Sequence, residues 1–221
     1  ERAGSLAPPR GRMAPLVDKR RLADARCADC DAPGPVFSRG RDTFRVPMAL
    51  HEANRARAAA LLRERHGARA RDVALLQGGE QLLRDDTDHE LLFRQESYFQ
   101  YLFGVCEPGC YGALALADGA ATLFVPRHGD DYEVWAGRAP TLAEFRAKYG
   151  VEDARFVDEL PAWLAARGFG EAGEAGEADD GDGDGDGARL HVLEGVNSDS
   201  GARAKPAELP LGGAIARARE G

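Results

Sequence analysis

The stretch from Phe93 to Gly112, FRQESYFQYLFGVCEPGCYG, constrains the fold more than any other part of this sequence. It places six aromatic residues within twenty positions of a chain that is otherwise poor in aromatic residues. Aromatic rings bury the largest area per residue, so we expect this stretch to anchor the core. Apolar residues recur at helical spacing over 98–103, and Gly104 follows them as a residue that ends helices. We favour a core helix here over a binding site. The side chains expected to be buried are those of Tyr98, Phe99, Leu102 and Phe103.

Strand and turn signals surround this helix. Glu107-Pro108-Gly109 is typical of a turn, and Asp118-Gly119 is typical of a hairpin between strands over 111–117 and 121–125. Further strands are predicted over 73–77, 91–93, 155–157 and 190–193. Helices are predicted over 47–66, over 141–149 and from 158 or 159 to 168. Elements that alternate in this way predict an α/β fold, with a mixed β-sheet flanked by helices.

Two of these helices have specific sequence signals. Thr141 is a favourable N-cap residue and Glu144 follows three positions later, which predicts a capping box. The helix over 47–66 begins with a proline, is rich in alanine, and is followed by Gly67. Its expected face at helical spacing consists of Leu50, Ala53, Arg57, Ala60 and Leu61.

Charge and composition divide the chain further. Eight acidic residues lie between residues 169 and 187, and without them 29 acidic residues balance 29 basic ones. We therefore expect an acidic, Gly-rich insert over 169–187, a disordered tail over 1–42, and no nucleic-acid surface. DGDGDGDG suggests calcium, but counting from Asp182 puts Leu193 where an EF-hand needs Glu. No apolar run is long enough to span a membrane.

Residue chemistry alone predicts neither a catalytic residue nor a metal ligand. The sequence contains no HExxH, GxSxG, P-loop or GxGxxG motif. A metal could in principle bind at Asp85, Asp86, Asp88 and His89, but neighbouring loop acids are more often simply solvated. Cys27-x-x-Cys30 lacks the second ligand pair that a zinc site needs. We therefore expect all four cysteines to be free thiols in a reducing compartment.

Four motifs carry a family resemblance. VALLQGGE, LFRQESYFQYLFGVCEPGCYG, TLFVPR and GVNSDSG occur in the order found in prolidases, the Xaa-Pro dipeptidases, which this chain closely resembles. The resemblance covers only the aminopeptidase P or creatinase-type N-terminal domain, placed at residues 43–168 and 188–210. It implies that residues 211–221 begin a linker towards a catalytic domain outside this chain. That domain would hold two manganese ions through two Asp, one His and two Glu, none of which can be assigned here.

The resemblance also implies partners and one site residue. It implies a cytoplasmic homodimer that hydrolyses Xaa-Pro dipeptides or peptides through the catalytic domain, whereas this chain alone is expected to be inactive. Trp135 lies where related prolidases place a tryptophan that caps a neighbouring active site, so it is a candidate substrate-binding residue. A tryptophan at the rim or in the core is the alternative. An alternative function is a stand-alone, non-catalytic interaction or dimerisation module.

Overall fold

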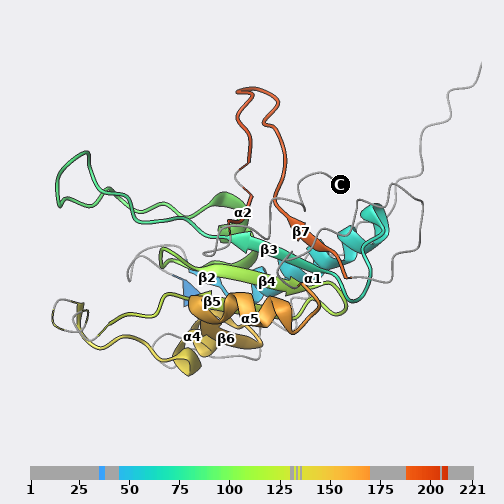
Figure 1. The fold of residues 1–221 in the computed structure, drawn as a ribbon, viewed down its shortest axis with the longest axis horizontal. Coiled ribbons are helices and arrows are strands. Elements are labelled where there is room, and N and C mark those ends of the chain that lie inside the picture. The colour runs from blue at the N-terminus through green and yellow to red at the C-terminus, as the bar shows by residue number, and fades with distance from the viewer. Residues whose placement is uncertain are drawn as a thin grey trace, which may run out of the picture.

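The computed structural model describes residues 35–37, 45–129, 132, 134, 136–169, 188–204 and 206–208. Helices and strands alternate along this part of the chain (Figure 1). The strands are β1 (Val36–Phe37), β2 (Val46–Pro47), β3 (Val73–Gln77), β4 (Tyr111–Ala115), β5 (Ala121–Val125), β6 (Asp153–Phe156) and β7 (Leu190–Val192). The helices are α1 (Ala49–His66), α2 (Ser97–Phe103), α4 (Leu142–Tyr149), the 3-10 turn η1 (Val157–Glu159) and α5 (Leu160–Ala165).

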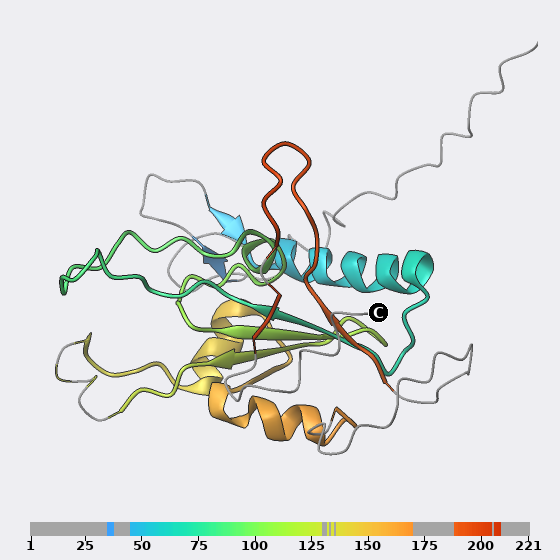
Figure 2. The same cartoon turned by 45° about the horizontal axis from the view of Figure 1, so that its top comes forward.

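A five-stranded mixed sheet forms the centre of the fold, in the order β6-β5-β4-β3-β7. The central strand β4 is antiparallel to both of its neighbours, β3 and β5, whereas β6 pairs in parallel with β5 and β7 pairs in parallel with β3. A separate antiparallel pair joins β1 to β2. Figure 2 shows α1 and α5 on opposite sides of the large sheet. This arrangement confirms the predicted α/β fold with a mixed sheet flanked by helices.

Alternate residues of the strands point to two different apolar clusters, as a period of two requires. Leu123 and Val125 of β5 join Phe99 and Phe103 of α2 in one cluster. Phe124, between them, belongs to the other cluster and meets Trp163 of α5 edge to face, with the ring centroids 5.4 Å apart. The sheet is therefore buried on both faces, which explains why β3 and β5 are nearly continuous apolar runs.

Most predicted elements are present, with shifted ends. The strand predicted over 111–117 ends at Ala115, and the one predicted over 155–157 begins at Asp153. The helix predicted over 47–66 begins at Ala49, because Pro47 belongs to β2. The strand predicted over 91–93 is wrong, since this segment is irregular backbone in a projecting hairpin over residues 80–94. Within that hairpin, an isolated antiparallel β-bridge joins Leu83 to Glu90.

The buried face of α1 differs from the predicted one. Leu50 is 37% exposed, and Arg57 and Ala60 are also exposed. The residues that α1 buries are His51, Asn54, Arg55 and Ala59. The physical reason is the element that α1 packs against. The buried face of α1 contacts the carboxyl end of α2, where the last helical carbonyl groups need hydrogen-bond donors more than they need apolar contact.

Asp72 joins the edge strand β7 to the centre of the sheet. Its buried carboxylate accepts hydrogen bonds from the backbone N–H groups of Arg69 (2.8 Å) and Arg189 (2.9 Å), and His191 Nε2 lies 3.1 Å away. Burial alone would raise the pKa of Asp72, but these donors outweigh it and lower the pKa below its ordinary value. This carboxylate therefore stays ionised and holds the start of β3 against β7.

Candidate functional site

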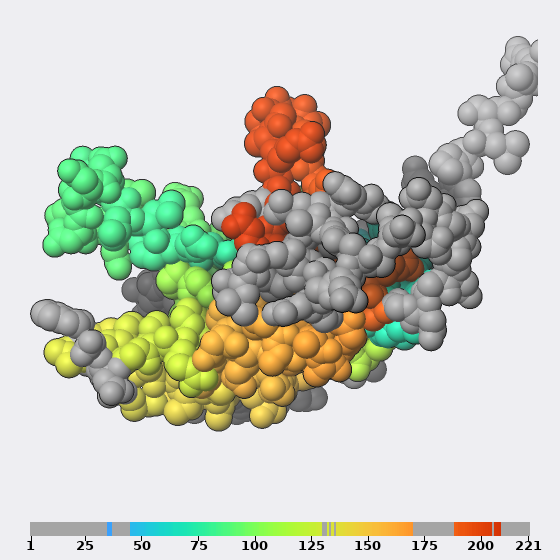
Figure 3. Space-filling view, viewed as in Figure 1, coloured from blue at the N-terminus to red at the C-terminus, as the bar shows by residue number. Residues whose placement is uncertain are grey.

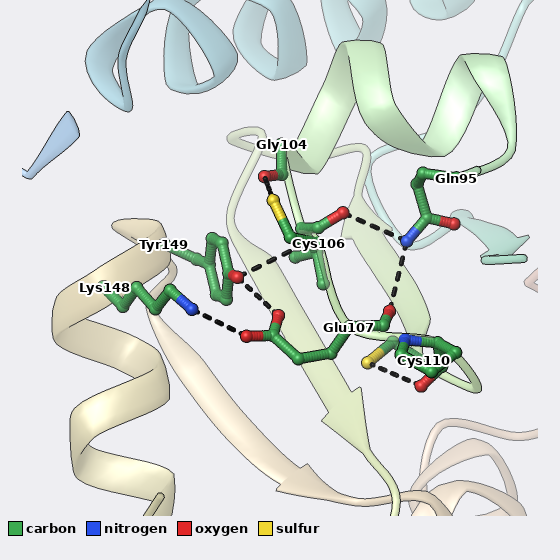
Figure 4. Close-up of polar contacts among 9 residues, drawn as sticks. Gln95, Gly104, Cys106, Glu107, Cys110, Lys148 and Tyr149 are labelled. Carbon is green, nitrogen blue, oxygen red and sulfur yellow. Dashed lines mark hydrogen bonds and ion pairs between the residues drawn. The ribbon is translucent and has the colours of Figure 1, made fainter. Parts of the chain in front are cut away.

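The candidate site is the turn over residues 104–110, which connects α2 to β4. Gly104 adopts φ +65° and ends α2, and Gly109 adopts φ +69° within the turn. Both values lie in the left-handed region that favours glycine. Side chains from three parts of the chain converge on this turn: Gln95 before α2, Glu107 within the turn, and Lys148 and Tyr149 at the end of α4 (Figure 4).

Gln95 is the residue that joins the segments of this site. Its Oε1 accepts hydrogen bonds from the backbone N–H groups of Gly79 (2.5 Å) and Glu96 (3.0 Å). Its Nε2 donates to the carbonyl oxygens of Val105 (3.0 Å) and Glu107 (3.2 Å). One amide side chain thus satisfies four backbone groups in the loop after β3, before α2 and in the turn.

Gly78 and Gly79, which precede the projecting hairpin, allow the segment around Gln95 and the turn to lie close to the end of β3. A Cβ atom at Gly79 would lie 2.9 Å from the carbonyl oxygen of Arg94, and one at Gly78 would lie 3.0 Å from that of Cys110. Backbone carbonyl groups cannot move aside as flexible side chains do. Gly78 and Gly79 are therefore favoured sterically, because a larger residue at either position would push these carbonyl groups away.

Glu107 connects the turn to α4. Its Oε1 lies 2.6 Å from Lys148 Nζ, and its other oxygen accepts a hydrogen bond from the Tyr149 hydroxyl. The Tyr149 oxygen accepts in turn from the backbone N–H of Cys106. Burial and the bond to Glu107 raise the pKa of Tyr149, so the phenol stays neutral and keeps the proton that it donates.

Cys110 is not a nucleophile in this setting. Its side chain is 0% exposed, and burial raises the pKa of its thiol to about 12. A buried, protonated thiol is inert, because the thiolate is the reactive form. The site as a whole positions backbone and binds groups by hydrogen bonds, and none of its side chains is activated for covalent chemistry.

The residues considered as metal ligands from the sequence lie apart from the turn over residues 104–110. Asp85, Asp86, Asp88 and His89 are exposed in the projecting hairpin. Within the described residues, no group of three or more His, Cys, Asp or Glu side chains is placed to hold a metal ion. Trp135, the candidate substrate-binding residue, lies outside the described residues. No helix in the described part of the chain is long and apolar enough to cross a membrane.

Sequence reasoning missed the roles of Gln95, Glu107 and Tyr149. Gln95 carries no local signal, since its four partners lie in three separate segments. Tyr149 lies four positions after Phe145, at helical spacing, and both side chains are buried. Its hydroxyl, however, needs a polar partner when it is buried, and that requirement was the available signal for a carboxylate nearby.

Replacing Gln95 by Leu is expected to lower the free energy of unfolding by about 2 kcal/mol, because four backbone groups lose a partner in a partly buried region. Urea unfolding followed by circular dichroism measures the change. Gln100→Leu is the matched control, because Gln100 is also partly buried and lies on α2. Equal destabilisation by both substitutions would show that loss of polarity, and not the Gln95 bonds, is responsible.

Comparisons with known proteins place this geometry in context. The family described as "Aminopeptidase P, N-terminal domain" matches residues 51–172. The Xaa-Pro dipeptidase of Pongo abelii is 38% identical over 176 residues, covering 80% of this chain and 32% of that protein. That of Homo sapiens is 38% identical over 178 residues, with the same coverage. This chain therefore spans about a third of the length of these curated relatives.

The aminopeptidase PepP of Pseudomonas aeruginosa is similar to this chain with a TM-score of 0.47 and 24% sequence identity. The similarity covers 55% of this chain and 26% of the other.

Proposed function

Because this chain belongs to the aminopeptidase P N-terminal domain family, we propose that it acts as the N-terminal domain of a manganese-dependent Xaa-Pro peptidase. The observation that carries the proposal is the match over residues 51–172, together with 38% identity to Xaa-Pro dipeptidases over 80% of the chain. The substrate would be a dipeptide or peptide with proline in its second position. The chemistry would take place in a catalytic domain that this domain helps to enclose.

The described residues do not fit a metal centre. A two-metal peptidase site needs a convergent set of carboxylates and histidines. The part of the chain in the structure offers no group of even three such side chains. Glu107, the best-placed carboxylate, is already bound to Lys148 and Tyr149. We therefore assign no step of peptide hydrolysis to these residues, and their role is to build a rigid wall.

Three finer features belong to the same proposal. The protein would act as a homodimer, and Trp135 would cap a neighbouring active site. The protein would also work in the cytoplasm, which is supported by Cys106 and Cys110, two cysteines of the same turn that are both free thiols. The alternative function is a stand-alone, non-catalytic interaction module. It is favoured by the same lack of a metal-binding group among the described residues.

A chimera tests the proposal directly. In it, residues 43–208 of this chain replace the matching region of the Homo sapiens Xaa-Pro dipeptidase, and Gly-Pro hydrolysis is measured with added manganese. We expect metal-dependent turnover by the chimera, little by the catalytic part alone, and none by the 221-residue chain. A folded chimera no more active than the catalytic part alone would favour the interaction module. Metal-dependent turnover by this chain alone would contradict its assignment as a non-catalytic domain.

A further inference from the structure

A hollow lies where the hairpin over residues 80–94 joins the body of the molecule, from which the hairpin stands clear (Figure 3). It has a volume of about 300 Å³. This volume is at the lower end of the range of small-molecule pockets, about 300–1,000 Å³. The hollow therefore has room for one small molecule. The residues that line it are Gln77, Gly78, Gly79, Glu80, Leu82, Arg94 and Glu96.

Two carboxylates of this hollow are held in place, each through one oxygen. Glu80 Oε1 accepts a hydrogen bond from Gln77 Nε2 (3.1 Å), and Gln77 Oε1 accepts from the backbone N–H of Glu208 (2.9 Å). Glu96 Oε2 accepts from the backbone N–H of Phe99 (2.7 Å). Among the described residues, no other hydrogen bond reaches either carboxylate. A carboxylate has about four acceptor positions, so each keeps one oxygen available to a donor from a ligand.

The guanidinium group of Arg94 belongs to the same hollow and is exposed. Within the described part of the chain, no hydrogen bond or ion pair engages it, although Glu80 and Glu96 line the hollow with it. A guanidinium group offers several N–H donors in a fixed plane and no acceptor. Opposite charges that border one hollow without pairing complement a ligand that carries both charges. The hollow therefore fits a small zwitterion better than an ion of a single sign.

We propose that this hollow binds a free α-amino acid with an apolar side chain. The ammonium group donates to the available oxygens of Glu80 and Glu96, and the carboxylate accepts from Arg94. Such charge-assisted hydrogen bonds are about twice as strong as neutral ones. Leu82, which is 60% exposed, supplies apolar contact to the side chain of the ligand. Hydrolysis of an Xaa-Pro dipeptide releases free amino acids, so the domain would also sense product, a step that rests on the proposed function.

An NMR titration of the 221-residue chain tests the binding, with the backbone amide signals of Gly78 and Gly79 as reporters of the hollow. L-Leucine is expected to shift these signals with a dissociation constant of about 1 mM or lower. L-Leucinamide lacks the carboxylate, and 4-methylpentanoate lacks the ammonium group. Each is expected to bind about tenfold more weakly or worse, because one set of charged contacts is lost.

Substitutions identify which charge meets which group of the ligand. Arg94→Gln is expected to weaken L-leucine by about tenfold and to leave L-leucinamide unchanged, because the amide never used the guanidinium group. Glu80→Gln is expected to weaken L-leucine and L-leucinamide and to leave 4-methylpentanoate unchanged. Arg84→Gln is the matched control, since Arg84 is an exposed arginine of the same hairpin that does not line the hollow. The remaining amide signals of each spectrum show that the variant is folded.

The results separate this site from its alternatives. Selective loss in the two variants, with no change in Arg84→Gln, supports the amino-acid site. A folded wild-type chain whose glycine signals do not respond to L-leucine overturns it. Equal affinity for L-leucine and L-leucinamide also overturns it and points to the N-terminus of a peptide. Equal weakening by Arg84→Gln would show a general charge effect and overturn the role of the hollow. None of these results depends on the chimera, which tests the peptidase assignment separately.

Discussion

Replacing Phe103 by Ala is expected to lower the free energy of unfolding by about 3–5 kcal/mol, the largest effect of any single substitution considered. Phe103 is 0% exposed and stacks on Phe99 with the ring centroids 5.0 Å apart. Its ring fills the space above Gly112, where a Cβ atom would lie 2.4 Å from the ring. Removing the ring leaves a cavity between α2 and β4 that neither rigid element can close.

Urea unfolding of the 221-residue chain measures this loss, and Tyr98→Ala is the control on the same helix. Tyr98 is 56% exposed, so its removal is expected to change the free energy of unfolding by no more than about 0.5 kcal/mol. The contrast separates core packing from helix propensity, since both substitutions place Ala on α2. Similar losses for the two variants would contradict the assignment of Phe103 as the anchor of this core.

Replacing Arg55 by Met is expected to lower the free energy of unfolding by about 3 kcal/mol, because one buried and one partly buried carbonyl group lose a charged donor. Arg55 is 1% exposed. Its two terminal nitrogens donate to Leu102 O at the end of α2 (3.1 Å) and to Gly150 O at the end of α4 (2.7 Å). A single guanidinium thus caps two helices, each of which ends in carbonyl groups with partial negative charge.

Arg57→Met is the matched control for this effect. Arg57 is exposed on the same helix, so the substitution removes a charge without uncovering a carbonyl group, and its expected effect is within about 0.5 kcal/mol. Thermal and urea unfolding of both variants give the comparison. If Arg55→Met were as stable as Arg57→Met, the hydrogen bonds to the two helix ends would contribute nothing net, and burial of the guanidinium would cancel their benefit.

Local signals in the sequence predicted much of the fold. Gly104 ends α2, and Thr141 and Glu144 form the predicted capping box. The Asp118-Gly119 turn joins β4 to β5 as expected. Such features depend on residues within a few positions of one another, so their chemistry can be read directly. Three of the four motifs that resemble prolidases lie within the residues matched by the family, and only GVNSDSG lies outside them. These motifs indicated the family because each one is a short run of adjacent residues.

Features that depend on contacts between distant segments could not be predicted. Tyr98 follows helical spacing yet faces solvent, because periodicity gives the faces of a helix and not the neighbour that covers each. The buried face of α1 is polar because the end of α2 lies against it, and nothing within α1 reveals that neighbour. Gln95 likewise gains its role from three segments at once.

The sequence by itself determined that the stretch from Phe93 to Gly112 forms a core helix, a turn and a strand, because these follow from spacing, glycine and proline. The tertiary structure alone decided what surrounds it. Packing places Phe103 inside and Tyr98 outside, makes Gln95 the link between the segments, and leaves the leucines of the hairpin over residues 80–94 exposed to solvent. The physical reason is that burial and hydrogen-bond satisfaction depend on the whole fold, whereas helix and turn formation depend on adjacent residues.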